Sequence, residues 1–214
     1  MEADDDLVPQ PDAKGVLDLT NRAWVNLDPT IWTMKITLVV LDLSYNHIHE
    51  IPPQLGELVL LKEFRASFNK IAVLPSEVGR LKRLRRLVLN NNRLTSLPHE
   101  LGRLEQMEDL VVSENLLDSV PATLSLCAVL RVLKLQNNKL RGLPFELADV
   151  MTLEDLDCSN NPGLDVVPEK WRGDTLSILF ICRVHRDYHT RMEEMSQVRV
   201  RVRVRPVAST VDLR

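Results

Sequence analysis

The sequence is poor in aromatic residues, which make up only 4% of its 214 positions, although 44% are hydrophobic. Leucine and valine must therefore supply most of the surface that folding buries. Long hydrophobic segments are also missing, since no stretch reaches the roughly eighteen apolar residues that a membrane-spanning helix requires. We therefore expect a chain with a substantial core and no membrane span.

Cysteine is scarce as well. Cys127, Cys158 and Cys182 form an odd set without a CxxC pair. The first residues, MEADDDLVPQPDAKG, lack the basic and apolar regions of a secretion signal. These features predict reduced thiols and a cytoplasmic location.

The charge is small overall but unevenly distributed. Residues 196–214 contain five arginines and one aspartate, which is a charge of +4. Since the whole chain has a net charge of −3, the remaining residues carry −7. An acidic main domain argues against general nucleic-acid binding by that domain.

A repeat with a period of 23 residues dominates the sequence. It is marked by an asparagine in each unit: Asn46, Asn69, Asn92, Asn115, Asn138 and Asn161. Apolar residues lie five and three positions before nearly every one of them, as in Leu87 and Leu89 before Asn92. A proline follows the first five asparagines after six residues, each time behind Ile, Leu or Val. Such regular spacing predicts stacked structural units, which bury together an apolar face that no single unit can bury alone.

The pattern LxxLxLxxNxLxxLPxxLGxLxx resembles the leucine-rich repeat. In each unit, the LxL segment alternates as a short strand with its leucines on one side. We therefore expect an α/β solenoid, with a curved parallel sheet on the concave face and loops and short helical turns on the convex face. Each repeat asparagine should be buried, where its amide can satisfy backbone groups as the chain leaves the strand.

Five segments follow from this frame. They are an acidic disordered tail (1–15), an atypical N-terminal capping repeat (16–40), the repeat array (41–172), a C-terminal capping helix (173–195) and a basic Val-Arg tail (196–214). In the capping repeat, Leu17-Asp18-Leu19 aligns with Leu41-Asp42-Leu43, and Trp24, Leu27 and Trp32 are expected to cover the open end. Strict Val-Arg alternation is a strand pattern. For the tail we favour disorder or an artefact over a basic arm for RNA or anionic lipid.

The expected capping helix starts near Asp174 or Thr175, either of which suits an N-cap. An apolar stripe then recurs every three or four residues: Leu176, Phe180, Val184, Tyr188, Met192 and Met195. We expect this stripe to shield the last coil of the array. The alternative is a seventh strand at residues 180–182, followed by a shorter helix.

The LPxxLGxL half of the repeat resembles the intracellular Ras-group type, which includes plant Ras-group-related proteins and scaffolds of Ras signalling. Further residues resembling the terminal cap of that type are Asn161-Pro162, Val167-Pro168, Gly173, Thr175, Ile178-Leu179 and Tyr188. The resemblance implies a non-enzymatic scaffold in intracellular signalling that binds a protein. The alternative that it leaves open is a regulatory subunit that inhibits or targets an enzyme such as a small GTPase or phosphatase.

Residues that flank the strand leucines are expected to face outward on the concave side, including the columns of Ser44 and Tyr45. The candidate partner-binding residues are Tyr45, Arg65, Phe68, Arg86, Val88, Asn91, Val111, Glu114, Lys134, Asn137 and Asp157. We expect Tyr45, Phe68, Arg65 and Arg86 to anchor the partner, since aromatics and arginine dominate interface energetics. The competing interpretation is that these residues are merely solvated.

No catalytic or metal-binding constellation accompanies the repeat. The tripeptide Arg172-Gly173-Asp174 is taken as chance, with Gly173 as a turn before the helix. His185 and His189 lie four residues apart without an evident third metal ligand. We therefore predict no enzymatic activity, no cofactor and no metal, and we expect a monomer.

Overall fold

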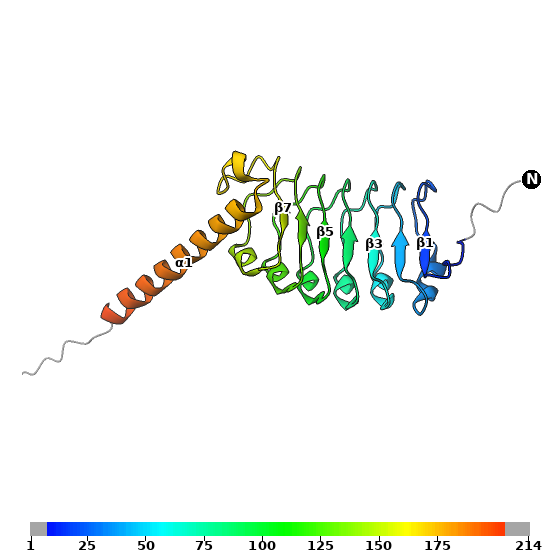
Figure 1. The fold of residues 1–214 in the computed structure, drawn as a ribbon, viewed down its shortest axis with the longest axis horizontal. Coiled ribbons are helices and arrows are strands. Elements are labelled where there is room, and N and C mark those ends of the chain that lie inside the picture. Colours follow the sequence, from blue (N-terminus) through cyan, green and yellow to red (C-terminus); the bar gives the residue numbers. More distant parts are fainter. Residues whose placement is uncertain (1–7, 204–214) are drawn as a thin grey trace, which may run out of the picture.

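The computed structural model describes residues 8–203, with side chains described as far as residue 192. Seven short parallel strands form one sheet in chain order (Figure 1). They are β1 (Val16–Asp18), β2 (Val40–Asp42), β3 (Glu63–Arg65), β4 (Arg86–Val88), β5 (Asp109–Val111), β6 (Val132–Lys134) and β7 (Asp155–Asp157). Each strand belongs to one coil of the solenoid, so the predicted fold class is confirmed.

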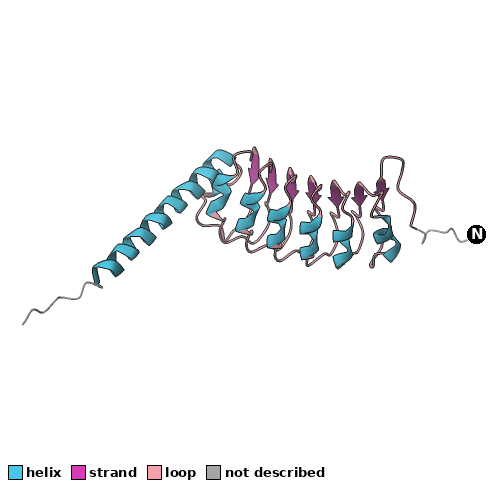
Figure 2. Cartoon of the chain, turned by 90° about the horizontal axis from the view of Figure 1, so that it is seen from below, coloured by secondary structure: helices cyan, strands magenta, loops and turns pink. Residues whose placement is uncertain are grey.

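Short 3-10 helices line the side of the solenoid opposite the sheet (Figure 2). They are η1 (Pro29–Met34), η2 (Pro53–Glu57), η3 (Ser76–Arg80), η4 (His99–Arg103), η5 (Ala122–Leu126), η6 (Phe145–Asp149) and η7 (Glu169–Trp171). The repeat prolines immediately precede η2 to η6 in extended conformation. Proline suits this position because its φ is fixed and it lacks an N–H that a helix start would leave unpaired.

Glycine allows η2, η3 and η4 to stack closely on the next coil. A Cβ at Gly79 would lie 2.7 Å from the backbone oxygen of Glu100, and one at Gly56 would lie 2.7 Å from the oxygen of Glu77. The LG of the repeat therefore reflects a close approach between backbones.

The core is a continuous row of leucines and similar residues between the sheet and the 3-10 helices. Cys127 and Cys158 occupy leucine positions in this row and are fully buried, as the sequence predicts. Burial raises the pKa of the Cys127 thiol to about 11 and that of Cys158 to about 12. Both thiols therefore act as small buried hydrophobes.

The repeat asparagines form a hydrogen-bonded ladder along the array. The Asn92 amide donates to the backbone oxygens of Ala66 (2.8 Å) and Leu89 (3.0 Å). Its oxygen accepts from the N–H of Ile71 at 3.0 Å. The same pattern recurs at Asn69, Asn115, Asn138 and Asn161, and Asn46 bonds similarly to the N-terminal coil. Each amide thus ties its own coil to the preceding one.

The N-terminal coil completes the sheet through β1, which pairs with β2. Trp32 is buried beneath it, and Trp24 and Leu27 pack against the core. Residues 8–15, expected to belong to a disordered tail, follow a defined path because Val8 is buried and the Asp12 carboxylate accepts from nearby backbone N–H groups. The rest of that expected tail, residues 1–7, lies outside the described residues.

The C-terminal end closes the sheet without another strand. The N–H of Cys158 donates to the oxygen of Arg172 (2.8 Å), and the N–H of Leu156 donates to the Thr175 hydroxyl (2.8 Å). The buried Arg172 guanidinium donates to the backbone oxygens of three residues, which are Asn161, Leu164 and Val167. Arg172, assigned to a chance tripeptide from the sequence, is therefore a structural element of the terminal coil.

A helix, α1 (Thr175–Arg203), follows, so the prediction of a helix in place of a further strand at residues 180–182 is confirmed. It runs beyond residue 195, the predicted end, into the segment expected to be disordered. No glycine or proline interrupts the chain between Thr175 and Arg205, and alternation gives a strand only where a neighbouring strand is available. Residues 204–214 lie outside the described residues.

The predicted orientation of the helix stripe is wrong. Ile178 and Cys182 pack into the last coil, whereas the stripe from Leu176 to Met192 faces outward. Both faces of the helix are apolar near its start, so periodicity alone did not decide which face meets the array.

Candidate interaction surface

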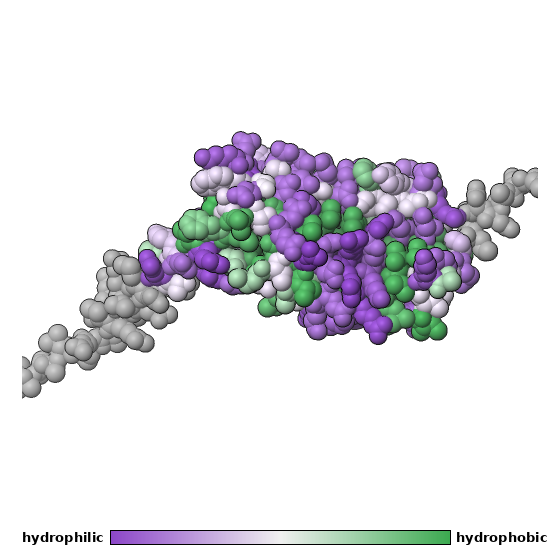
Figure 3. Space-filling model, viewed as in Figure 1, coloured by the Kyte–Doolittle hydropathy of each residue, from purple (hydrophilic) through white to green (hydrophobic). Residues whose placement is uncertain are grey.

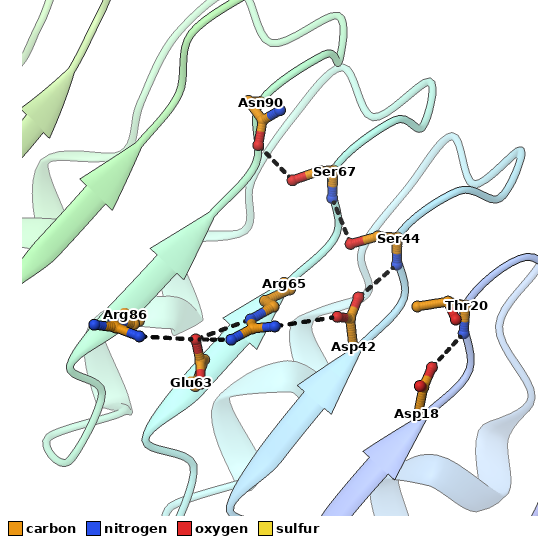
Figure 4. A network of polar contacts seen from close by, with 9 residues as sticks. All are labelled: Asp18, Thr20, Asp42, Ser44, Glu63, Arg65, Ser67, Arg86 and Asn90. Atoms are coloured by element: carbon orange, nitrogen blue, oxygen red, sulfur yellow. Dashed lines mark hydrogen bonds and ion pairs between the residues drawn. The ribbon is translucent and has the colours of Figure 1, made fainter. Parts of the chain in front are cut away.

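The concave sheet carries charged side chains that pair with one another (Figure 4). Arg65 donates to Glu63 at 2.7 and 2.8 Å and lies 3.8 Å from Asp42. Arg86 donates to Asp109 at 2.6 Å and lies 3.8 Å from the same Glu63. The two predicted arginine anchors are therefore already engaged with carboxylates of their own sheet.

The same pairing recurs further along the sheet. The Lys134 ammonium lies 2.6 Å from the Asp155 carboxylate. At the earlier pair, the hydrogen bond from Arg86 to Asp109 and the charge of Asp109 raise the pKa of Arg86. Between the charged regions, Val88 and Val111 pair in register and lie half-buried. These valines form a small apolar strip between the paired charges of the sheet.

The column that contains Ser44 is not outward-facing as expected. Ser44, Ser67 and Ser113 are buried. The Ser67 hydroxyl donates to the Asn90 side chain at 2.6 Å, and the Ser67 N–H donates to the Ser44 hydroxyl at 3.2 Å (Figure 4). Small hydroxyl side chains fit where the chain bends away from the strand, and they link neighbouring coils.

The next column has a left-handed backbone in every coil. The residues of this column with positive φ are Asn21 (55°), Tyr45 (59°), Phe68 (56°), Asn91 (56°), Glu114 (55°), Asn137 (58°) and Asn160 (53°). Asparagine tolerates this geometry best after glycine, whereas bulky side chains adopt it rarely. Backbone geometry therefore explains the four asparagines of this column, whereas Tyr45, Phe68 and Glu114 are exceptions.

Tyr45 and Phe68 form a stacked pair on the surface. Their ring centroids lie 4.5 Å apart, with 7° between the ring planes. Tyr45 is 57% exposed and Phe68 is 43% exposed. The structure thus brings two predicted anchors together. Their left-handed backbone disfavours bulky side chains, and the rings are too exposed for burial to offset that cost.

The other predicted contact residues have local roles in the array. Asn137 donates to the Glu114 carboxylate at 2.6 Å. The Asp157 carboxylate accepts from the N–H of Ser159 at 2.9 Å, as Asp42 does from Ser44. Such bonds fix the bend at the end of each strand.

Two cations that follow this column in the sequence were not among the predicted contact residues. Lys70 follows Phe68 by two residues, and Arg93 holds the same position in the next coil. Arg93 is exposed and Lys70 half-buried. Among residues 8–192, neither takes part in an ion pair or a side-chain hydrogen bond. The 23-residue register would have identified this column.

A cleft of about 200 Å³ lies between α1 and the last coils. Phe145, Ile181, Cys182, His185 and His189 contribute to its lining. Burial raises the pKa of Cys182 to about 11. In the described part of the chain, no three potential ligands gather around a metal position, and no helix is long and apolar enough to cross a membrane.

Two family models match the chain. One leucine-rich repeat model matches residues 82–140 and another matches residues 37–58. No curated protein matches the chain significantly. These family matches fall within the array.

Solved structures share the fold over much of the chain. A leucine-rich repeat protein of Leptospira interrogans is 32% identical with a TM-score of 0.65, over 69% of this chain and 38% of that protein. An internalin of Listeria monocytogenes is 28% identical with a TM-score of 0.57, over 64% of this chain and 39% of that protein. The Arabidopsis receptor kinase HAESA is 29% identical with a TM-score of 0.55, over 61% of this chain and 23% of that protein.

The chain thus spans well under half of each of these three structures. Leucine-rich repeat domains are typically protein-interaction modules and are generally non-catalytic. The 23-residue repeat, the single parallel sheet and these matches together show that the chain is a leucine-rich repeat protein.

Proposed function

We propose that this chain is a non-enzymatic scaffold that binds a protein segment along the edge of its concave sheet, with Tyr45 and Phe68 at the centre of the contact. The supporting observation is the exposed, stacked pair of rings at left-handed positions. Asparagine would suit the backbone better at both sites, as in four other coils. A contact with a partner accounts for aromatic residues where the fold itself favours asparagine.

The charges around the pair indicate the chemistry of the partner. Lys70 and Arg93 lie in the loops that follow β3 and β4, without carboxylate partners in the described chain. Arg65 and Arg86 are already paired within the sheet. We therefore expect a partner segment with an apolar or aromatic residue for the rings and acidic residues for Lys70 and Arg93.

A peptide-like ligand has a precedent among the similar structures. The Arabidopsis receptor kinase HAESA is described in complex with a peptide hormone and a co-receptor. The free, buried cysteines of this chain fit a reducing compartment such as the cytoplasm.

The Ras-group resemblance supplies a second part of the proposal. Each of the prolines that define the LPxxLGxL half precedes a 3-10 helix, and Gly56, Gly79 and Gly102 lie at close backbone contacts. The resemblance makes a small GTPase, a phosphatase or another signalling protein the class of partner to examine.

The test compares proteins captured by the full chain and by three variants. Tyr45→Asn/Phe68→Asn removes the rings, and Lys70→Glu/Arg93→Glu reverses the two cations. Val73→Asn, at an exposed valine outside the site, is the matched control. A partner of the proposed site should bind the wild type and the control equally, and both site variants at least about tenfold more weakly, since hot-spot residues each contribute more than about 1 kcal/mol.

The captured protein should then be mapped by cross-linking and its bound segment measured by titration calorimetry. Equal binding of every captured protein to the wild type and to Tyr45→Asn/Phe68→Asn would contradict the proposal. Unfolding of each variant in urea shows whether a lost interaction reflects a lost fold.

A further inference from the structure

The helix α1 carries an apolar stripe that nothing in the described chain covers. Leu176 is 78% exposed, Phe180 67%, Val184 49%, Tyr188 60% and Met192 48%. Hydrophobic side chains gather where the helix leaves the array (Figure 3). The opposite face of the helix is occupied, because Ile178 and Cys182 are buried against the last coil.

The stripe is large enough to form an interface. Five side chains of this size, about half to three-quarters exposed, present on the order of 500 Å². That is the upper range of apolar patches on monomeric proteins. Two such surfaces packed together bury at most about 1,000 Å², near the lower limit for a specific contact.

The helix also extends well away from the array (Figures 1 and 2). Short helical segments without tertiary contacts are marginally stable in water, particularly when they expose apolar residues. A second helix packed along α1 would supply the missing contacts.

The stripe is symmetric about Val184, because its members follow one another at intervals of four residues. We propose that a second copy of this chain packs on the stripe, with the two α1 helices antiparallel and related by a two-fold axis near Val184. Phe180 then faces Tyr188 of the other copy, on either side of the paired Val184 side chains. Each four-residue step turns the stripe by about 40° around the helix, so Leu176 and Met192 lie at the two margins of the contact. A two-fold contact places the same surface on both copies, so no further exposed surface remains to extend the assembly.

The charges beside the stripe fit this arrangement. Arg183 and Asp187 lie on one flank, and both are exposed. In an antiparallel pair, like flanks face each other, so Asp187 of each copy comes within a turn of Arg183 of the other. In a parallel pair, this flank would instead meet the flank that holds Ile181 and His185, which carries no carboxylate for Arg183.

The oligomeric state of the full chain tests the proposal by sedimentation equilibrium. We expect a monomer–dimer equilibrium with a dissociation constant of about 10 µM, typical of an interface at the lower size limit. Val184→Glu places two carboxylates at the two-fold axis and should raise that constant about a hundredfold. Val73→Glu, at an exposed valine of the array, is the matched control and should leave it unchanged.

Because Val184 is exposed in the single chain, thermal unfolding of Val184→Glu at low concentration should match that of the wild type. A wild type that stays monomeric at about ten times the expected dissociation constant would overturn the proposal. A Val184→Glu variant that dimerises like the wild type would do so as well.

Two further measurements test the orientation. Arg183→Glu and Asp187→Arg should each weaken the dimer, and the double variant should restore it. Under mild oxidation, chains with Phe180→Cys should cross-link to chains with Tyr188→Cys, since the three native cysteines are buried. Efficient cross-linking of Phe180→Cys chains to one another would show a parallel pair and overturn the antiparallel arrangement.

Discussion

Replacing Asn92 with alanine removes one step of the asparagine ladder. Two of its three closest partners keep another donor, because the oxygens of Ala66 and Leu89 also accept from the amides of Asn69 and Asn115. The N–H of Ile71 is different, since the Asn92 oxygen is its acceptor in a buried position. One orphaned buried N–H should lower the free energy of unfolding by about 2 kcal/mol, within the usual range of about 1–3.

Urea unfolding followed by circular dichroism and tryptophan fluorescence measures this change. Arg93→Ala, at the exposed neighbouring residue, is the control and should lie within about 0.5 kcal/mol of the wild type. Asn92→Asp sharpens the test, because it keeps the acceptor for Ile71 but turns a carboxylate oxygen toward two carbonyl oxygens. We expect it to be at least as destabilised as Asn92→Ala. An alanine variant as stable as the wild type would refute this role of the ladder.

Four further predictions concern other parts of the array. Tyr45→Asn should be about 0.5–1 kcal/mol more stable to urea than Tyr45→Ala, because asparagine tolerates a positive φ; equal stabilities would contradict backbone strain there. Gly79→Ala should lower the unfolding free energy by about 1–3 kcal/mol, since the added Cβ would lie 2.7 Å from the backbone of the next coil. Gly142→Ala is the control and should leave stability unchanged, because its Cβ would meet nothing within 4 Å. Arg172→Met should lower the unfolding free energy by about 2–5 kcal/mol, because the carbonyl oxygens of Leu164 and Val167 lose their donor and that of Asn161 keeps only the N–H of Leu164; an unchanged unfolding midpoint would argue against its structural role. Burial raises the pKa of Cys158 from near 9 to about 12, so its contribution to stability is present below pH 9 and is lost as the pH rises toward 12; rapid alkylation of the folded protein at pH 8 would contradict this.

The sequence is sufficient to predict the repeat, because the 23-residue period fixes which residues face the core in every coil. Leu87, Leu89 and Asn92 are buried where the pattern places them. The number of strands and the terminal helix follow from the same frame. The period specifies one physical environment per position, and the structure repeats that environment along the array.

The charge pairs and the left-handed column were not predicted. Glu63 and Arg65 lie two residues apart on β3, and their pairing depends on side-chain conformations that the repeat spacing does not specify. The left-handed backbone had a signal in Asn91, Asn137 and Asn160, one residue before the ladder asparagines. Asparagine is common at a positive φ, so Asn91 and Asn137 could have been assigned to the backbone turn. Tyr45 would then have stayed a candidate contact residue.

The orientation of α1 also required the structure. Its start, Thr175 to Val184, has apolar residues on nearly every side. Which face packs inward depends on the shape that the last coil offers to Ile178 and Cys182. A helical period identifies a helix but does not choose between two apolar faces.

The closure of β7 has a consequence for how the protein behaves in a crowded solution. In the inner coils, the N–H groups of Val112 and Leu135 donate to the following strand. At β7 the corresponding N–H of Cys158 donates to Arg172, and the N–H of Leu156 donates to Thr175 of the same chain. This end of the sheet therefore offers no ready template for a strand from another molecule, and it is protected against aggregation by edge-to-edge growth.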